Sequence, residues 1–291
     1  MRRSRLLVRS AYHQAIPLTL RRRVHASIRR RQRQRAYSLD ENLRSMPQRL
    51  RGLKDKYRGQ RCFIMGNGPS LNQMDLELFR REYVWASNKC YLLFDRISWR
   101  PAFYVAVDTR VVPDIAAPID NLVRSLPETM SFFPAKFREQ GVLRSHPNVY
   151  WYRQVPDDET NLPQSMFTWD ASEGVSAVTT VTIAALQLAV YLGFNPIYLI
   201  GCDTSYSSRP NTRIEGTNPD ELTADRDDDL DHFDARYFGA GCKFHEPHVE
   251  RMVFHYEQAK RACEALSTSV FNATVGGKLD VFPRIDYREL F

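Results

Sequence analysis

The chain has 291 residues and a formal net charge of +7, with 43% hydrophobic and 26% charged residues, which is the composition of a globular protein with a sizeable core. No apolar run reaches the roughly 18 residues of a membrane-spanning helix, and no segment has the apolar core and cleavage site of a secretory signal. The five cysteines are scattered without a CxxC pair, which supports neither a zinc ribbon nor a disulfide framework and indicates buried thiols in a reducing compartment.

The positive charge is concentrated at the N-terminal end of the chain. Residues 1–36 hold twelve arginines and no acidic residue. Subtracting these twelve from the 41 basic residues leaves 29 against 34 acidic ones, so residues 37–291 have a net charge of −5. We therefore predict a basic helical extension over residues 1–55 and a globular domain over residues 56–291.

The basic extension interleaves its arginine clusters with apolar residues such as Leu6, Tyr12 and Val24. This pattern suits a helix, interrupted near Pro17, that lies on an anionic membrane surface, where each arginine contributes on the order of 1 kcal/mol. A solvated tail, a nucleic-acid arm and a matrix-targeting presequence are the alternatives. We expect a cytoplasmic protein that associates peripherally with the inner membrane through residues 1–36 and has no specific nucleic-acid partner.

From about residue 57 onward, short apolar runs alternate with helical patterns. The expected strands are 61–65, 84–87, 102–107, 129–134, 148–152, 195–200 and 269–272. The expected helices are 72–82, 182–192 and 247–266. This alternation predicts an α/β fold, a Rossmann-like, doubly wound and mostly parallel sheet. Residues 207–243 are polar and are predicted to form a long lid loop over the site.

Polar residues follow the expected strands at their carboxyl ends, where open parallel sheets bind ligands. The first such segment is Gly66-Asn67-Gly68-Pro69-Ser70, directly after strand 61–65. Its glycines let backbone N–H groups approach an anion, the next helix offers its positive end, and Ser70 can cap that helix or bind a phosphate. A plain strand-to-helix turn is the alternative. The segment is neither a Walker A loop nor GxGxxG, so nicotinamide binding is not expected.

Three further strand ends and one helix start supply candidate binding residues. Asn88 can read a base or a ribose hydroxyl with its amide, or it can be an ordinary loop residue. Asp108 can bind a ribose, a sugar or a metal, and it can also cap a helix. Thr180 opens the apolar helix and can bind a phosphate or serve as the cap. Asp203 can hold substrate hydroxyls, and Tyr206 can donate to a phosphate or simply pack.

Four histidines gather late in the sequence: His232, His245, His248 and His255. A histidine near its ordinary pKa can take a proton from an attacking hydroxyl. His248 and His255 are seven residues apart and share a face of the expected helix, where packing is the competing explanation. No cysteine or carboxylate stands at metal-ligand spacing to them, so we expect no metal site.

Several of these segments together resemble the bacterial sialyltransferases that use CMP-sialic acid. The segments are Cys62 to Leu71, Asn88, Leu192 to Asp203, and Tyr237-Phe238-Gly239. The same signatures mark the broader domain family named after 6-hydroxymethylpterin diphosphokinase, to whose C-terminus residues 272–286 are similar. The resemblance covers roughly residues 58–286 and implies a metal-independent transferase with a nucleotide beneath the first loop.

The resemblance also implies roles for individual residues. In those sialyltransferases the loop asparagine and the asparagine ending the second strand contact the nucleotide, and the matching positions are Asn67 and Asn88. A further asparagine after their third strand is replaced here by Asp108, which leaves the base specificity open. Their catalytic base is a histidine that follows a Tyr-x-Gly segment. His245 is the nearest match at a longer spacing, and His248 stays open.

We therefore expect a glycosyltransferase that takes a sugar from a nucleotide donor, most simply a CMP-linked one, and transfers it to an envelope glycan or glycolipid. The donor is a co-substrate, and no cofactor is expected. One alternative is an ATP- and magnesium-dependent diphosphokinase acting on a pterin-like alcohol, with Asp108 and Asp203 holding the metal. Another is a nucleotide-binding protein without catalysis.

Overall fold

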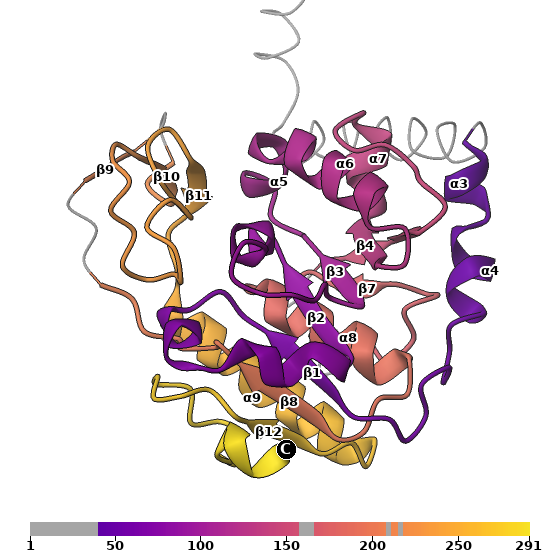
Figure 1. Cartoon of the computed structure of the whole chain (residues 1–291). Helices are drawn as coiled ribbons and strands as arrows, with labels where there is room; N and C mark the ends of the chain where they lie inside the picture. Colours follow the sequence, from indigo (N-terminus) through magenta and orange to yellow (C-terminus); the bar gives the residue numbers. More distant parts are fainter. Residues whose placement is uncertain (1–39, 157–165, 208–210, 215–217) are drawn as a thin grey trace, which may run out of the picture. The chain divides into compact units, whose positions relative to one another are not determined.

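The computed structural model describes residues 40–156, 166–207, 211–214 and 218–291 (Figure 1). The predicted membrane-binding segment therefore lies outside the described residues. The chain divides into two compact units, residues 1–44 and 45–291. In the first unit the described helix is α3 (Glu41–Arg44). None of the described helices is both long and apolar enough to cross a membrane.

The second unit is built on a seven-stranded sheet of order β12-β8-β1-β2-β3-β4-β5, in which every neighbouring pair is parallel. Its strands are β1 (Cys62–Met65), β2 (Val84–Ser87), β3 (Phe103–Val105), β4 (Met130–Pro134), β5 (Val149–Tyr152), β8 (Ile197–Ile200) and β12 (Val270–Asn272). The chain starts in the middle, runs out to β5 and returns on the other side of β1. This order confirms the predicted parallel α/β sheet and places its switch point between β1 and β8.

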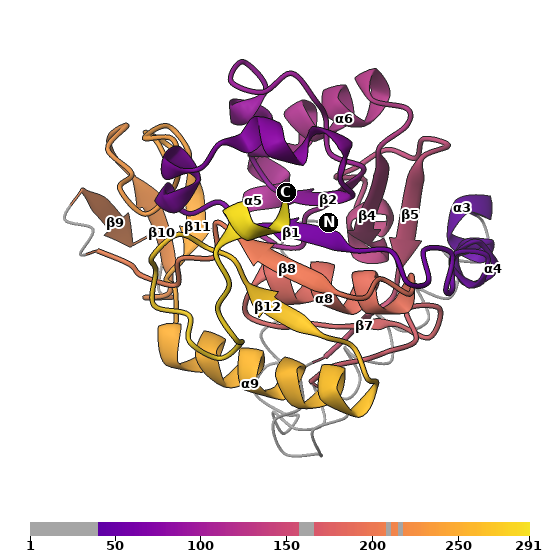
Figure 2. The same ribbon diagram turned by 60° about the horizontal axis from the view of Figure 1, so that its bottom comes forward.

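Helices cover both faces of this sheet, and Figure 2 shows α6 on one side and α9 on the other. The helices are α4 (Met46–Arg51), α5 (Val111–Asp114), α6 (Ala116–Ser125), α7 (Ala135–Glu139), α8 (Val181–Tyr191) and α9 (Val249–Ala265). Because both faces are covered, all four residues of β1, β2 and β8 are buried, which explains their continuous apolar runs. Helix α8 packs against β1, β2 and β3 and is apolar nearly all round, as a fully buried helix must be.

The expected helix over residues 72–82 is wrong. The structure has two short 3-10 helices there, Pro69–Gln73 and Leu76–Arg81. Asp75 lies between them in an extended conformation, and its side chain accepts the N–H of Glu77, so it caps the second helix and separates it from the first. This local capping overrides the helical pattern of the segment.

The predicted lid loop is also wrong in part, because the region contains a small antiparallel sheet of order β11-β10-β9 (Figure 1). Its strands are β9 (Thr212–Ile214), β10 (Glu221–Ala224) and β11 (Lys243–His245). These strands have three or four residues with mostly polar side chains, so composition indicated a loop. Their stability comes from pairing between residues far apart in the sequence, such as Glu221 with His245. A further two-stranded sheet joins β6 (Gln154–Val155) to β7 (Val175–Ser176).

Candidate functional site

A cavity of about 510 Å³ opens at the carboxyl ends of the central strands. Its walls come from the segments that follow β1, β2, β3 and β8, from the start of α8, and from β11 with the start of α9. The segments after β1 and β8 flank the switch point of the sheet, where ligands of this architecture bind. Every candidate residue named from the sequence lines this cavity except Pro69, Ser70 and the buried His255.

The turn after β1 holds one of the protein's own carboxylates. Ser70 donates its N–H to Asp203 Oδ1 at 3.2 Å and its hydroxyl to Asp203 Oδ2 at 2.7 Å. The N–H groups of Gly66 and Gly68 donate to backbone carbonyls at the end of β8, at 2.8 and 2.9 Å. Burial raises the pKa of Asp203, and the hydrogen bonds from Ser70 oppose that rise. The backbone donors that the sequence suggested for a phosphate are thus engaged inside the protein.

The glycines of this turn are required by close packing. A Cβ atom on Gly68 would lie 1.7 Å from Asp203 Oδ2, and one on Gly66 would lie 2.3 Å from the carbonyl oxygen of Gly201. Both distances are far below any van der Waals contact. The two glycines are therefore needed because the ends of β1 and β8 approach each other closely. From the sequence alone, this packing requirement has the same Gly-x-Gly pattern as a loop that binds an anion.

Asn67 and Asn88 line the cavity. Asn67 Nδ2 donates to Ser87 Oγ at 2.8 Å, while Asn88 adopts a left-handed backbone with φ of 48°. The Oδ1 atoms of both asparagines lack a hydrogen-bond partner among the described residues. A buried acceptor without a partner is costly in free energy, so both asparagines occupy positions that the fold alone does not favour.

The central pair of the site joins β11 to the segment after β3. His245 Nδ1 lies 2.9 Å from Asp108 Oδ2, and Asp108 Oδ1 accepts the N–H groups of Arg110 and Val111 at 2.7 and 3.0 Å. Asp108 is therefore also a local cap, as the sequence allowed. Because a carboxylate can only accept, it favours the tautomer with the proton on Nδ1 and leaves Nε2 for a substrate hydroxyl.

The two members of this pair shift each other's pKa. The hydrogen bond to Asp108 raises the pKa of His245, against the lowering effect of burial. Burial alone would raise the pKa of Asp108, but the hydrogen bond and charge of His245, with the two backbone N–H groups, bring it below its ordinary value. The pKa shifts thus favour the carboxylate of Asp108 and extend the imidazolium of His245 to a higher pH than usual, above which the neutral ring presents Nε2 as an acceptor.

We expect the His245–Asp108 pair to stabilise the fold most between about pH 4 and 6.5, the ordinary pKa values of the two groups. The contribution of Asp108 is present above its unfolded pKa and is lost as pH falls through its lowered folded pKa. The contribution of His245 is present below its unfolded pKa and is lost as pH rises through its raised folded pKa. Urea unfolding of wild type and Asp108→Asn should differ most inside this window. A difference that does not vary with pH would contradict the pairing.

The other histidines have different surroundings. His248 precedes α9, lines the cavity and lies 3.4 Å from an oxygen of Asp220. His232 lies 2.7 Å from Asp229 and stacks on Tyr237 with ring centroids 4.0 Å apart. His255 is buried within α9. For His255 the packing explanation therefore holds.

The start of α8 also faces the cavity. Thr180 caps this helix by accepting the N–H of Thr182 at 3.3 Å, so the capping interpretation of Thr180 is confirmed. Thr179 Oγ1 lies 3.0 Å from His255 Nδ1. Tyr206, in the segment after β8, lines the cavity as well. The positive end of an eleven-residue helix is thus directed toward the space where a ligand would bind.

The aspartates that the diphosphokinase alternative assigns to magnesium do not form a joint ligand set. Asp108 is engaged by His245 and two backbone N–H groups, and Asp203 is engaged by Ser70. Within the described part of the chain, no group of three or more His, Cys, Asp or Glu side chains is placed to hold a metal ion. The residues present do not fit the metal site of that alternative.

Sequence reasoning missed Arg110 and Glu221. Arg110 Nη1 lies 2.5 Å from Glu221 Oε2, beside the His245–Asp108 pair. Arg110 follows Asp108 by two residues at a strand end, which is a weak signal. Glu221 lies in the region predicted to be a loop and carried no signal.

Comparison with known proteins shows a family and a distantly similar structure. A family model described as 6-hydroxymethylpterin diphosphokinase MptE-like matches residues 37–209, more than half of the chain. The structure of the MAf glycosyltransferase from Magnetospirillum magneticum AMB-1 is similar with a TM-score of 0.44 and 17% identity. That alignment covers 85% of this chain and 39% of the glycosyltransferase, so the chain spans well under half of its length. No curated protein matches the chain. The family match ends before β10 and β11, so Glu221 and His245 lie beyond it.

Proposed function

The chain belongs to the 6-hydroxymethylpterin diphosphokinase MptE-like family, and we propose that it is a glycosyltransferase with a nucleotide-sugar donor. The observation that carries this proposal is the His245–Asp108 pair, at 2.9 Å, in the wall of the cavity that also contains Asn67 and Asn88. A histidine held by a carboxylate is a general base for a hydroxyl, which a glycosyl acceptor supplies.

In the proposed reaction the acceptor hydroxyl donates a hydrogen bond to His245 Nε2. The hydroxyl oxygen attacks the anomeric carbon of the donor sugar while its proton passes to Nε2. The electron pair of the breaking bond leaves with the phosphate oxygen of the nucleotide. Asp108 stabilises the imidazolium that forms, because its carboxylate is fixed by two backbone N–H groups and does not have to move.

The leaving phosphate is proposed to lie at the start of α8 rather than in the turn after β1. The donors of that turn are engaged by Asp203 and by backbone carbonyls, whereas the positive end of α8 borders the cavity. Thr180 and Tyr206 also line the cavity, and their hydroxyls can contribute hydrogen bonds to the phosphate. Asn67 and Asn88 would read the nucleoside with their amides.

The finer assignments follow from the resemblance. We propose a CMP-linked donor and an envelope glycan or glycolipid acceptor, with the basic residues 1–36 holding the enzyme at the inner face of a membrane. The CMP-linked donor can be tested directly, because nucleotide binding should stabilise the folded protein by mass action.

We expect CMP to raise the melting temperature without magnesium, since a ligand at 100 times its Kd adds about 2.7 kcal/mol of stability. A panel of CMP, UDP, GDP and ATP, each with and without magnesium, identifies the nucleotide. Asn88→Gly should weaken binding about threefold to tenfold, the value of one hydrogen bond, because glycine keeps the left-handed backbone and removes only the amide.

Asp55→Gly is the matched control, since Asp55 also has a left-handed backbone, with φ of 57°, and does not line the cavity. It should leave the melting shift unchanged. A shift confined to ATP with magnesium would favour the diphosphokinase alternative. The absence of a shift with every nucleotide would overturn the proposed function.

A further inference from the structure

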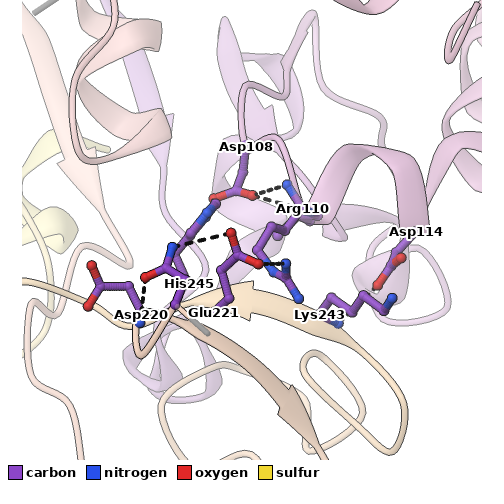
Figure 3. A network of polar contacts seen from close by, with 9 residues as sticks. Asp108, Arg110, Asp114, Asp220, Glu221, Lys243 and His245 are labelled. Carbon is purple, nitrogen blue, oxygen red and sulfur yellow. Dashed lines mark hydrogen bonds and ion pairs between the residues drawn. The ribbon is translucent and has the colours of Figure 1, made fainter. Parts of the chain in front are cut away.

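Two links join the small sheet that carries His245 to the turn after β3 (Figure 3). The first is His245 to Asp108 at 2.9 Å, and the second is Arg110 to Glu221 at 2.5 Å. Asp108 and Arg110 are two residues apart on one turn. Glu221 lies directly opposite His245 in the pairing of β10 with β11.

This register places both links on one side of the small sheet. Residues directly opposite each other in an antiparallel pair project to the same face, so Glu221 and His245 both point toward residues 108–110. The side chains of Arg110 and Glu221 are 14% and 33% exposed, which makes this a largely shielded ion pair. Such a pair constrains geometry more strongly than a solvated surface pair.

The small sheet needs a link of this kind because it is separate from the seven-stranded sheet. Among the described residues, β11 pairs with β10 and with no strand of the central sheet. Besides the two side-chain links, the N–H of Lys243 donates to Asp114 Oδ2 of α5 at 2.9 Å. The position of His245 relative to Asp108 therefore depends on these polar contacts with the segment 108–114, together with the packing of the buried Phe244 of β11 and the contact of Lys89 Nζ with Cys242 Sγ at 2.9 Å.

We propose that Arg110 and Glu221 are positioning residues that dock β10 and β11 so that His245 stays at hydrogen-bond distance from Asp108. This inference rests on the proposed function, in which His245 is the catalytic base. A displacement of about 1 Å at a reacting group can cost on the order of a hundredfold in rate. Since Asp108 and Asp114 still hold the sheet, we expect loss of the ion pair to lower kcat about tenfold.

The charged groups around His245 give a readout that does not require activity. Asp108 and Arg110 face it from the turn after β3, and Glu221 faces it from β10. Asp220, Glu246 and His248 line the same cavity, and Lys243 and Asp114 meet beside it (Figure 3). The hydrogen bond to Asp108 is the main cause of the raised pKa of His245, with a smaller raising effect from Glu221 and a lowering one from Arg110.

The experiment is a double-mutant cycle of Glu221→Gln and Asp108→Asn in the full chain, with the pKa of His245 read from NMR titration of its ring. Glu221→Gln should lower this pKa in the wild-type background, because the contact with Asp108 loosens. In the Asp108→Asn background it should lower the pKa much less, because the contact that Glu221 maintains is already weakened. Without a positioning role, loss of the Glu221 charge would lower the pKa equally in both backgrounds.

Turnover provides the second readout. Glu221→Gln should lower kcat about tenfold with donor affinity unchanged. Arg110→Gln should lower kcat by a similar factor. Arg110→Lys should lower kcat less than Arg110→Gln does, because lysine keeps the positive charge. Arg213→Gln is the matched control, since Arg213 pairs with Asp225 on the same small sheet but away from the cavity, and it should change neither readout.

The outcomes separate this inference from the proposed function. An equal fall of the His245 pKa in both backgrounds indicates only a through-space charge effect and would overturn the positioning role, as would no change in either background. If the His245 pKa falls less in the Asp108→Asn background but no nucleotide sugar supports glycosyl transfer, the positioning role is kept and the proposed function is rejected.

Discussion

His245→Ala is expected to lower the rate of glycosyl transfer about 10²- to 10⁴-fold, the usual contribution of a general base, while donor binding changes little. The reason is geometric. Asp108 engages Nδ1 at 2.9 Å and is itself fixed by two backbone N–H groups, so only Nε2 is left to take the acceptor proton. The measurement is kcat with the donor identified by the melting panel, together with the donor Kd from calorimetry.

His146→Ala is the matched control for this variant. His146 forms the same kind of pair with Asp120, also at 2.9 Å, and it does not line the cavity. Its replacement should leave transfer unchanged. Wild-type turnover in His245→Ala would remove His245 from the mechanism.

His248 is the other histidine at the cavity wall for which the sequence left a catalytic role open. Its Nε2 lies 3.4 Å from Asp220, and half of its side chain is exposed. It therefore has weaker support for a proton-accepting role than His245 has. We expect His248→Ala to cost less in kcat than His245→Ala, and the reverse order would assign the base to His248.

Gly66→Ala is expected to lower the free energy of unfolding by about 3 kcal/mol, at the upper end of the usual cost of overpacking a filled interior. A Cβ at this position would lie 2.3 Å from the carbonyl oxygen of Gly201, a backbone atom that cannot rotate away. The ends of β1 and β8 would have to separate, and with them the contact of Ser70 with Asp203. Urea unfolding followed by circular dichroism measures the loss.

Gly52→Ala is the control, because its Cβ would have its nearest neighbour, the carbonyl oxygen of Arg49, at an ordinary 3.4 Å. Its stability should change little. If Gly66→Ala were as stable as wild type, the β1 and β8 ends would not be as close as described, and the anion-cradle interpretation of the turn would regain its basis.

Local patterns of apolar and polar residues predicted most of the strands and helices. The apolar runs at 61–65, 84–87 and 195–200 correspond to β1, β2 and β8 within one or two residues, because a strand buried on both faces must be apolar throughout. The expected helix 182–192 corresponds to α8 for the same reason. The failures, at 72–82 and 207–243, are segments where capping or distant pairing decides the backbone.

By itself the sequence determined that the chain forms a parallel sheet and that Asn67, Asn88, Asp108, Thr180 and Asp203 gather at one edge of it. For the four residues that follow strands, this is because the carboxyl ends of parallel strands share an edge, and Thr180 joins them because a helix that leads into a parallel strand begins at that edge. Only the tertiary structure decided that Asp203 engages the first turn and that His245 reaches Asp108, 137 positions away. Such contacts depend on how separately formed sheets dock, which short-range patterns of apolar and polar residues do not encode.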